Sequence, residues 1–182
     1  VSGLIGGGVA VNSGSTLVVS SSVIHDNRAG TGGGGIGGHI NAAEAIKVFS
    51  STISNNAAHN GGGIALISTH PTSYPSASVL LSRSTVTQNT ASNGTGGAGG
   101  GIYNDQAQPA TITTHGSIIA GNTAFLPDSS DVAGSLNSAG THNVIGRPGT
   151  SGLTTGPGAN KVGTNAVPLD PKLSRLDNHG GP

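Results

Sequence analysis

One stretch decides the fold of this chain: Val48-Phe49-Ser50-Ser51-Thr52-Ile53-Ser54-Asn55-Asn56-Ala57-Ala58, followed shortly by Gly61-Gly62-Gly63-Ile64. It contains an apolar residue, a serine, an aliphatic residue two positions later and an asparagine three positions after that. A glycine cluster closed by an aliphatic residue then ends the pattern. The same pattern is written four times along the chain. Periods of about 20–50 residues are typical of repeat architectures.

Aligning the four copies gives columns of identical or similar residues. The serine column is Ser22, Ser51, Ser84 and Ser117. The aliphatic column is Ile24, Ile53, Val86 and Ile119. The asparagine column is Asn27, Asn56, Asn89 and Asn122. An apolar pair precedes each copy as Leu17/Val19, Ile46/Val48, Val79/Leu81 and Ile112/Thr114, so that only Thr114 interrupts it. The glycine clusters close with Val9, Ile36, Ile64 and Ile102, at spacings of 27, 28 and 38 residues.

Apolar and polar residues alternate in short runs inside each copy, which is the period of a strand. The sequence therefore predicts an all-β protein: a right-handed parallel β-helix (solenoid) of about four to five coils, with three short strands per coil. The turn signals Asn60-Gly61 and Asn93-Gly94 stand at the same point of two copies. They therefore indicate a corner between two strands of one coil. A two-sheet sandwich would instead need hairpin turns between neighbouring strands.

Stacking explains what each column does. Coils about 4.8 Å apart place equivalent residues directly above one another. We expect the aliphatic column to form a continuous inner row and the asparagine column to form a ladder of side-chain amides. The serine column belongs to the same structural ladder. Glycine allows a tight turn with positive φ and a close approach to the neighbouring coil.

The regular repeats predict β-helix coils over residues 1–122. Residues 123–182 are predicted to form a last, irregular coil and a C-terminal capping segment of the same domain. There Asp131-Val132-Ala133-Gly134 replaces the glycine cluster, and residues 147–162 read as a loop rich in Gly, Pro, Thr and Ser. We expect residues 168–176, which have leucines spaced three and four apart, to cover the open end of the last coil.

Composition narrows the classes of partner. The seven basic residues balance seven acidic ones and are scattered singly, so no basic patch favours nucleic acid. No apolar run approaches the roughly 20 residues that span a bilayer. Cysteine is absent, so disulfides contribute nothing. The chain begins with Val1, within a repeat and without methionine, which suggests a processed or excised segment whose export signal is gone.

The repeat, with its Gly-Gly-x-Ile and Asn-Asn signatures, resembles the parallel β-helical repeats of bacterial surface and secreted proteins of the polymorphic outer-membrane-protein type. The C-terminal part, with Asn143-Val144-Ile145-Gly146, Leu169-Asp170-Pro171-Lys172-Leu173 and Asn178-His179-Gly180-Gly181-Pro182, is similar to the end of bacterial right-handed β-helix proteins of the choice-of-anchor type. His179 interrupts the Asn-Gly-Gly-Pro of that family. The resemblance implies this fold and export, and it implies little about activity.

No constellation for catalysis or metal binding is visible in the sequence. Glycoside hydrolysis needs two facing carboxyl groups, yet Asp26 shares its column with Asn55, Gln88 and Gly121. Asp131 stands where a glycine closes the other clusters and is interpreted as a turn residue. The seven histidines show no metal-ligand spacing. We therefore predict no catalytic residue, no metal and no cofactor, and an enzyme is disfavoured.

Two insertions stand at corners of the repeat, one over residues 68–76 and one over residues 91–98. Binding residues concentrate on such loops. The candidate binding residues are His70, Tyr74, Asn93 and Thr95, and Asn93-Gly94-Thr95 is also a sequon for N-glycosylation.

The preferred hypothesis is an exported, non-enzymatic structural or adhesive module, located outside the cell or on its surface. Unpaired strand edges invite another chain, so one version of this hypothesis is a subunit that stacks head to tail in a fibre or surface layer. Its partners would be copies of itself, an extracellular polysaccharide or a cell surface, and not nucleic acid. The alternative is a β-helix protein that binds or degrades polysaccharide as a lyase or hydrolase does. Only four aromatic residues are available for stacking on sugars.

Overall fold

The structure is a computed structural model that describes residues 4–12, 14–39, 45–67, 77–92, 96–105, 110–174 and residue 176. Within these residues it contains eighteen short strands and two single-turn 3-10 helices, η1 (Pro127–Ser129) and η2 (Pro157–Ala159). Every pairing between these strands is parallel. The protein is therefore all-β and built from parallel sheets. No helix in the described part of the chain has the length and hydropathy to cross a membrane.

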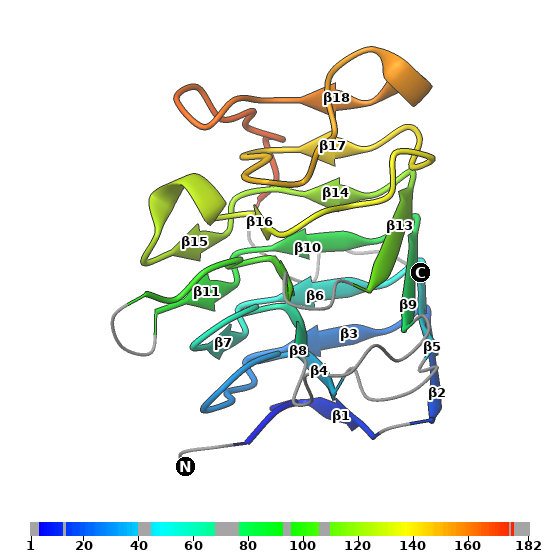
Figure 1. Cartoon of the computed structure of the whole chain (residues 1–182), viewed down its shortest axis with the longest axis vertical. Coiled ribbons are helices and arrows are strands. Elements are labelled where there is room, and N and C mark those ends of the chain that lie inside the picture. Colours follow the sequence, from blue (N-terminus) through cyan, green and yellow to red (C-terminus); the bar gives the residue numbers. More distant parts are fainter. Residues whose placement is uncertain are drawn as a thin grey trace.

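The strands fall into four sheets; the first repeat adds one strand to three of them, and the second, third and fourth repeats add one strand to each sheet (Figure 1). The five-stranded sheet contains β1 (Val9–Val11), β4 (Ile36–His39), β8 (Ile64–Ile67), β12 (Ile102–Asn104) and β16 (Val132–Ala133). The four-stranded sheet contains β2 (Thr16–Ser20), β5 (Ala45–Phe49), β9 (Ser78–Ser82) and β13 (Thr111–His115). The six-stranded sheet contains β3 (Val23–His25), β6 (Thr52–Ser54), β10 (Thr85–Thr87), β14 (Ile118–Ile119), β17 (Val144–Ile145) and β18 (Lys161–Val162). The three-stranded sheet contains β7 (Ala57–Ala58), β11 (Thr90–Ala91) and β15 (Thr123–Ala124).

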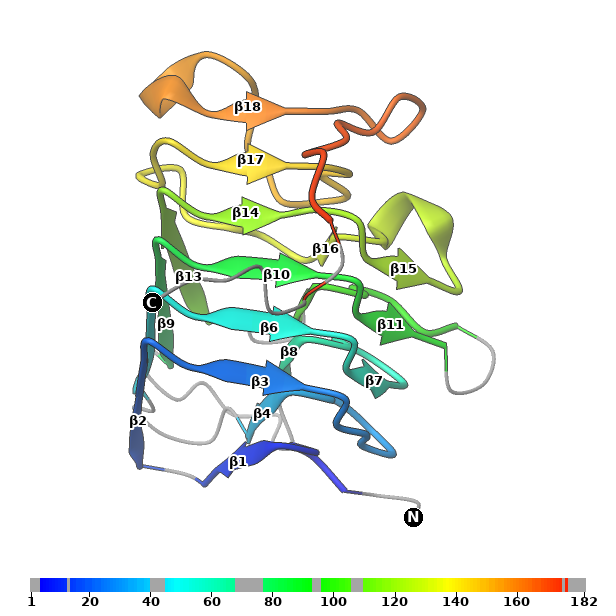
Figure 2. The ribbon, with the colours of Figure 1, turned by 180° about the vertical axis from the view of Figure 1, so that it is seen from behind.

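The register of these sheets reproduces the alignment of the repeats. In the six-stranded sheet Ile53 pairs with Val86, and Val86 pairs with Ile119. In the five-stranded sheet Ile64 pairs with Ile36 on one side and Ile102 on the other. The columns of the sequence are therefore columns in space. The paired strands of successive repeats lie above one another (Figures 1 and 2).

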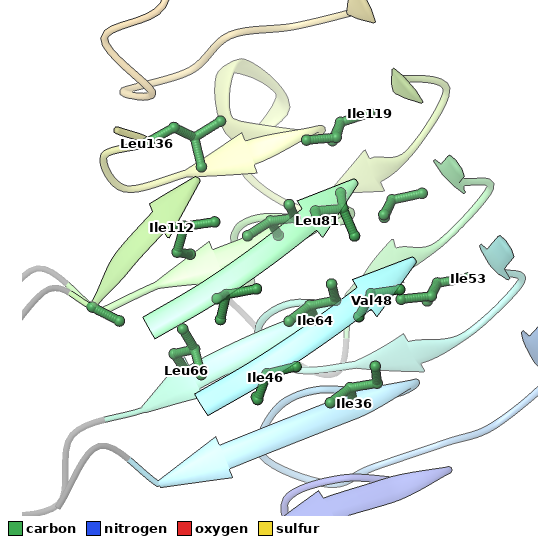
Figure 3. Close-up of a cluster of buried hydrophobic side chains, with 14 of the residues drawn as sticks. Ile36, Ile46, Val48, Ile53, Ile64, Leu66, Leu81, Ile112, Ile119 and Leu136 are labelled. Atoms are coloured by element: carbon green, nitrogen blue, oxygen red, sulfur yellow. The ribbon is translucent and has the colours of Figure 1, made fainter. Parts of the chain in front are cut away.

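Alternation within each strand separates core from surface. In β5, Ile46 and Val48 are fully buried while Lys47 between them is exposed. Successive side chains of a strand point to opposite faces of the sheet, so this alternation places the apolar pair inside. The inward side chains of the sheets pack together in rows (Figure 3), and Ile36, Ile53 and Ile64 have no exposed surface. Burying one such side chain contributes about 1.5–3 kcal/mol.

Two features differ from the sequence-based prediction. The second, third and fourth repeats each have a fourth strand in addition to the three expected; β7, β11 and β15 each have two residues, too few to show an alternating pattern. Residues 147–162, predicted as a loop, end in β18, which pairs in register with β17. The sequence does not indicate this strand, because Lys161 and Val162 stand alone after a long run rich in glycine, proline and threonine.

The C-terminal segment leaves β18 and turns back along the side of the stack. Both views show it running past β17 towards the level of β16 and not across the outer edge of β18 (Figures 1 and 2). Leu169 is anchored there, since its backbone N–H donates to the Gly146 carbonyl at 3.1 Å. The expectation was a segment that covers the end of the last coil. The described part of this segment lies beside the sheets instead.

Candidate functional site

The four asparagines of the repeat form one hydrogen-bonded column, which we call the asparagine ladder. The Nδ2 group of Asn27 donates to Asn56 Oδ1 at 3.0 Å, and the same bond joins each later pair at 3.0 and 2.9 Å. The backbone N–H of each donor residue reaches the same oxygen, at 3.0 Å in all three steps. The Oδ1 atoms of Asn56, Asn89 and Asn122 each therefore accept two hydrogen bonds from the preceding rung, and the ladder has one direction.

The second amide hydrogen of each inner rung is also used. Asn56 Nδ2 donates to the Ile24 carbonyl at 2.9 Å, and Asn89 Nδ2 donates to the Ile53 carbonyl at the same distance. Asn56 and Asn89 have no exposed surface. Burying an amide without partners costs several kcal/mol, so this complete set of bonds is what allows a polar column to stand at the edge of the core.

A residue in the left-handed conformation precedes each rung of the asparagine ladder. These residues are Asp26, Asn55, Gln88 and Gly121, with φ of 57°, 55°, 57° and 73°. Positive φ turns the chain sharply, which brings the following asparagine inward. Asp26 is exposed at this corner and its carboxylate lies 2.6 Å from His25 Nδ1. It has no carboxylate above it in the stack, which agrees with the spacing of the sequence.

Each glycine of the triad Gly61-Gly62-Gly63 is required for a different local reason. Gly61 has a φ of 58°. A Cβ on Gly62 would lie 2.5 Å from backbone atoms of Thr90. A Cβ on Gly63 would lie 3.1 Å from Asn89 Nδ2. Only the first glycine is required for its conformation; the other two are required because the ladder and the next strand occupy the space of a side chain.

A second column, the hydroxyl ladder, runs through the serines. The backbone N–H of Ser22 donates to Ser51 Oγ at 3.1 Å, and the next two steps repeat this bond at 3.2 Å. Each hydroxyl in turn donates to the carbonyl two residues earlier, as Ser51 Oγ does to Phe49 at 2.7 Å. The serine column therefore closes the corner after the four-stranded sheet in the same way that the asparagines close the next corner.

The hydroxyl ladder continues past the fourth repeat with amides. The Ser117 N–H donates to Asn143 Oδ1 at 3.0 Å, and the Asn143 N–H and Nδ2 groups donate to Asn160 Oδ1 at 2.9 and 3.0 Å. Asn143 and Asn160 are not part of the serine column predicted from the sequence. The signal was present, because each stands immediately before a strand of the six-stranded sheet, as Ser117 does.

Asp131 terminates the asparagine ladder. Asn122 donates to Asp131 Oδ1 through its backbone N–H at 2.9 Å and through Nδ2 at 2.8 Å. The other carboxylate oxygen, Oδ2, accepts the backbone N–H of Arg147 at 2.6 Å. The interpretation of Asp131 as a turn residue holds for its backbone, which bends directly before β16, but it misses the role of the side chain. Its backbone occupies the glycine column, as expected, but its side chain fills the next position of the asparagine column.

The environment of Asp131 changes its acidity. Burial raises the pKa of its carboxyl group above the ordinary 3.8. The N–H groups of Arg147 and Asn122 that donate to the carboxylate lower this pKa, but their effect is smaller than that of burial. The residue is only 3% exposed. A Cβ on Gly146 would lie 2.4 Å from Asp131 Oδ2, so the absence of a side chain at Gly146 provides the space that the carboxylate occupies.

The C-terminal edge of the six-stranded sheet is closed by one side chain. The Val162 N–H of β18 donates to Thr155 Oγ1 at 2.9 Å, and the same hydroxyl donates back to the Val162 carbonyl at 2.8 Å. Asn160, the last residue of the hydroxyl ladder, also has partners for its side-chain amide, since Asn160 Nδ2 donates to the carbonyls of Gly140 and Pro157. These side chains satisfy the polar groups that an edge strand would otherwise offer to another chain.

The N-terminal edge is different. Strands β1, β2 and β3 each have a neighbour on one side only among the described strands. No described residue donates to Asn27 Oδ1 or to Ser22 Oγ, although every later rung accepts at the equivalent atom. The core is also less covered here: Ile24 is partly exposed, whereas its column mates Ile53 and Val86 are fully buried. Among the described residues, the β18 edge therefore has its polar groups paired with side chains, whereas Asn27 Oδ1 and Ser22 Oγ accept no hydrogen bond.

The candidate binding residues of the two insertions, His70, Tyr74, Asn93 and Thr95, lie outside the described residues. They stay predictions. In the part that is described, no three histidine or acidic side chains gather in a way that could hold a metal ion.

One groove of about 590 Å³ opens beside η1, against the turn at Gly149 and Thr150. Its lining is mostly apolar, with Leu126 47% exposed. Asp128 and Asn165 contribute polar groups. The Asn165 Oδ1 atom is already bound to the Gly149 N–H at 3.1 Å. The groove therefore has few polar atoms to orient a ligand.

Comparison with protein-family models found no match, and comparisons with curated proteins and with solved structures found no significant match. The resemblance to polymorphic outer-membrane-protein repeats and to choice-of-anchor proteins therefore stays a prediction from the sequence.

Proposed function

We propose that this protein is a structural module, a right-handed parallel β-helix whose stacked coils form a rigid rod segment. The observation that carries the proposal is the pair of ladders, which run without interruption from Asn27 to Asp131 and from Ser22 to Asn160. In-register amide columns stabilise flat stacks of parallel strands. A molecule organised in this way presents long, regular faces.

The ladders also account for the polar groups that could otherwise suggest chemistry. The buried amides and the buried carboxylate of Asp131 form their hydrogen bonds with backbone groups and with one another. Groups with all partners inside the protein hold the fold together, whereas catalytic groups face a ligand. This favours a scaffold role for the residues that the repeat singles out.

The proposed location is extracellular or on the cell surface, and the proposed contact is adhesive. The outer face of the four-stranded sheet supports an adhesive surface, since Val18, Lys47, Leu80 and Thr113 form one outward row across it. Val18 is 59% exposed. A mixed apolar and basic row of this kind suits contact with a polysaccharide or with another surface protein.

The experiment that tests the structural role is a screen of the purified chain against acidic and neutral polysaccharides. Release of reducing ends and of unsaturated uronic acids would be followed over days. We expect no depolymerisation, together with slow amide hydrogen exchange at Asn56, Asn89 and Asn122, because a scaffold opens there only on global unfolding. Chain-dependent depolymerisation would overturn the proposal, and so would an experimental structure with hairpins or left-handed coils.

A polysaccharide-binding role is the second candidate, and the groove beside η1 favours it. Phe125 directly precedes Leu126, which lines that groove, and the Phe125 side chain is 53% exposed. Its ring is therefore available to stack on a sugar ring. Phe125→Ala would then weaken retention on polysaccharide affinity gels, while Val23→Ala, on the outer face of β3 and also exposed, would not. Equal retention of both variants and the parent chain would remove this candidate.

A further inference from the structure

The groove beside η1 has walls that hydrogen bonds hold in place. The backbone N–H of Ser130 donates to the Pro127 carbonyl at 3.1 Å, which closes the single turn of η1. The turn at Gly149 is tied to the C-terminal segment, because the Gly149 N–H donates to Asn165 Oδ1 at 3.1 Å. The volume of about 590 Å³ lies within the range of roughly 300–1,000 Å³ that ligand sites occupy. The groove is therefore preformed and large enough for a small organic ligand.

Exposed apolar side chains stand on two of the segments that form this groove. Leu126 lines it, and Phe125 directly precedes Leu126 in the chain. Val167 follows two residues after Asn165, another lining residue, and is 72% exposed. Exposed apolar groups around a concave surface are typical of binding sites. This arrangement favours a ligand with an apolar face.

Two polar side chains of the lining have hydrogen-bonding groups to offer. Because Asn165 Oδ1 accepts the Gly149 N–H, the Nδ2 group of Asn165 is left as a donor, and no described residue accepts a hydrogen bond from it. The Asp128 carboxylate likewise accepts no hydrogen bond from the described residues. A purely apolar ligand would remove water from both groups and replace it with nothing, which costs free energy. The ligand must therefore donate to a carboxylate and accept from an amide, and hydroxyl groups do both.

The charges around the groove favour an uncharged ligand. Among the described residues that line it, Asp128 is the one with a charged side chain. The guanidinium group of Arg147 stands nearby, since its Nη1 atom donates to the Pro127 carbonyl at 3.2 Å. An acidic ligand would meet the carboxylate, and a cationic ligand would meet the guanidinium group. Neither kind of charge finds a surplus of the opposite sign here.

We infer that the groove beside η1 binds an uncharged polysaccharide chain, with one sugar ring packed on Leu126 and Phe125 and its hydroxyl groups bonded to Asp128 and Asn165. A pyranose ring provides both surfaces that the groove requires. Its C–H groups form an apolar face that packs on an aromatic ring, and its hydroxyl groups donate and accept hydrogen bonds. The inference rests on the polysaccharide-binding candidate of the proposed function, to which it adds the class of sugar and the two residues that select it.

Titration of the purified chain with defined oligosaccharides tests the ligand class. The neutral probes are cellohexaose and maltohexaose, the acidic probe is hexagalacturonate, and the cationic probe is a chitosan hexamer. Calorimetry gives the affinities, and backbone amide chemical shifts locate the site. We expect one of the neutral chains to bind at least about tenfold more tightly than the charged chains, and to shift the amides of Leu126, Gly149 and Thr150. Tighter binding of a charged chain, no binding of any chain, or shifts confined to the four-stranded sheet would overturn the inference.

Two conservative variants test the polar pair. Asp128→Asn keeps the size of the side chain and removes its charge. Asn165→Asp keeps an acceptor for the Gly149 N–H and removes the donor. We expect each variant to bind the neutral chain about tenfold more weakly, because hydrogen bonds to a charged group are the strong ones. Asp26→Asn, which changes an exposed carboxylate in the first repeat, is the matched control and should leave the affinity unchanged. Unchanged affinity in both groove variants, or an equal loss in the control, would contradict the inference.

Two results separate this inference from the proposed structural role. If no oligosaccharide binds while the amides of Asn56 and Asn89 exchange slowly, the glycan site is overturned and the scaffold stands. If the parent chain cleaves a bound neutral oligosaccharide and Asp128→Asn weakens that binding, the glycan site is supported and the non-enzymatic scaffold is overturned.

Discussion

Asn122 Nδ2 lies 2.8 Å from Asp131 Oδ1, although the two residues are only nine positions apart in the sequence. Every earlier step of the asparagine ladder spans 29 or 33 residues, one complete repeat. The last step is short because the carboxylate comes from the glycine column of the following repeat and not from its asparagine column. A carboxylate can accept all the hydrogen bonds that reach it, and it needs no acceptor of its own.

We predict that Asn89→Leu destabilises the chain by about 3 kcal/mol or more. The substitution leaves the buried backbone N–H and amide of Asn56 without their acceptor, and each unsatisfied buried group costs about 1–3 kcal/mol. Urea unfolding followed by circular dichroism measures the loss. Asn27→Leu is the control, because no described residue donates to Asn27 Oδ1, and we expect it to cost about 1 kcal/mol. Equal losses for the two variants would contradict the ladder as described.

We predict that the stability of the chain falls as the pH rises from 3.8 through the pKa that Asp131 has in the folded protein. The folded pKa is raised by burial, so in this window the native state binds more protons than the unfolded state, and the free energy of unfolding decreases with pH. Above the folded pKa the contribution is constant. Asp131→Asn, which cannot titrate, flattens the profile in this window. Thermal unfolding at closely spaced pH values measures both, and an unchanged slope in the variant would argue against this assignment.

We predict that Thr114→Val stabilises the chain by about 1 kcal/mol, because a buried hydroxyl without a partner costs free energy that a methyl group does not. Thr114 has no exposed surface, its Oγ1 atom has no hydrogen-bond partner, and it pairs with Leu81 in the apolar column. Thermal and urea unfolding give the difference. The neighbouring Thr113→Val lies on the outer face and is expected to change stability by less than about 0.5 kcal/mol. A destabilised Thr114→Val protein would show that the hydroxyl has an unrecognised role.

We predict that Gly62→Ala costs about 2–3 kcal/mol, since its Cβ would lie 2.5 Å from the backbone N and O atoms of Thr90 and would push two strands apart. Gly152→Ala is the comparison. Gly152 has a φ of 76°, and a Cβ there would have no atom within 4 Å, so only backbone strain of about 1 kcal/mol is added. Unfolding curves of both variants separate the free-energy cost of a steric contact from the cost of an unfavourable backbone conformation. A larger loss at Gly152 would show that conformation dominates.

The columns could be predicted from the sequence because in-register stacking turns a repeat in one dimension into contacts in three. Ser51, Ile53 and Asn56 each pair with residues that the alignment had already placed beside them. Thr114 was also recognisable as the one polar residue in an apolar column. The structure adds that its hydroxyl has no hydrogen-bond partner.

The closing residues could not be predicted in the same way. Asp131 belongs to one column by its backbone and to another by its side chain, and an alignment assigns each residue to a single column. Thr155 closes the β18 edge from a turn, where no pattern of neighbours distinguishes it from the other threonines. Asn143 and Asn160 replace serine by a longer side chain that reaches the same N–H group, which a search for identical residues overlooks.

The exchange of an amide for a carboxylate at Asp131 has a consequence for the end of the asparagine ladder. An asparagine there would need an acceptor for its own amide, as Asn160 does at the end of the hydroxyl ladder, where the carbonyls of Gly140 and Pro157 accept it. The Asp131 carboxylate has no hydrogen and needs no such acceptor. The asparagine ladder can therefore stop at Asp131 while the six-stranded sheet continues through β17 and β18.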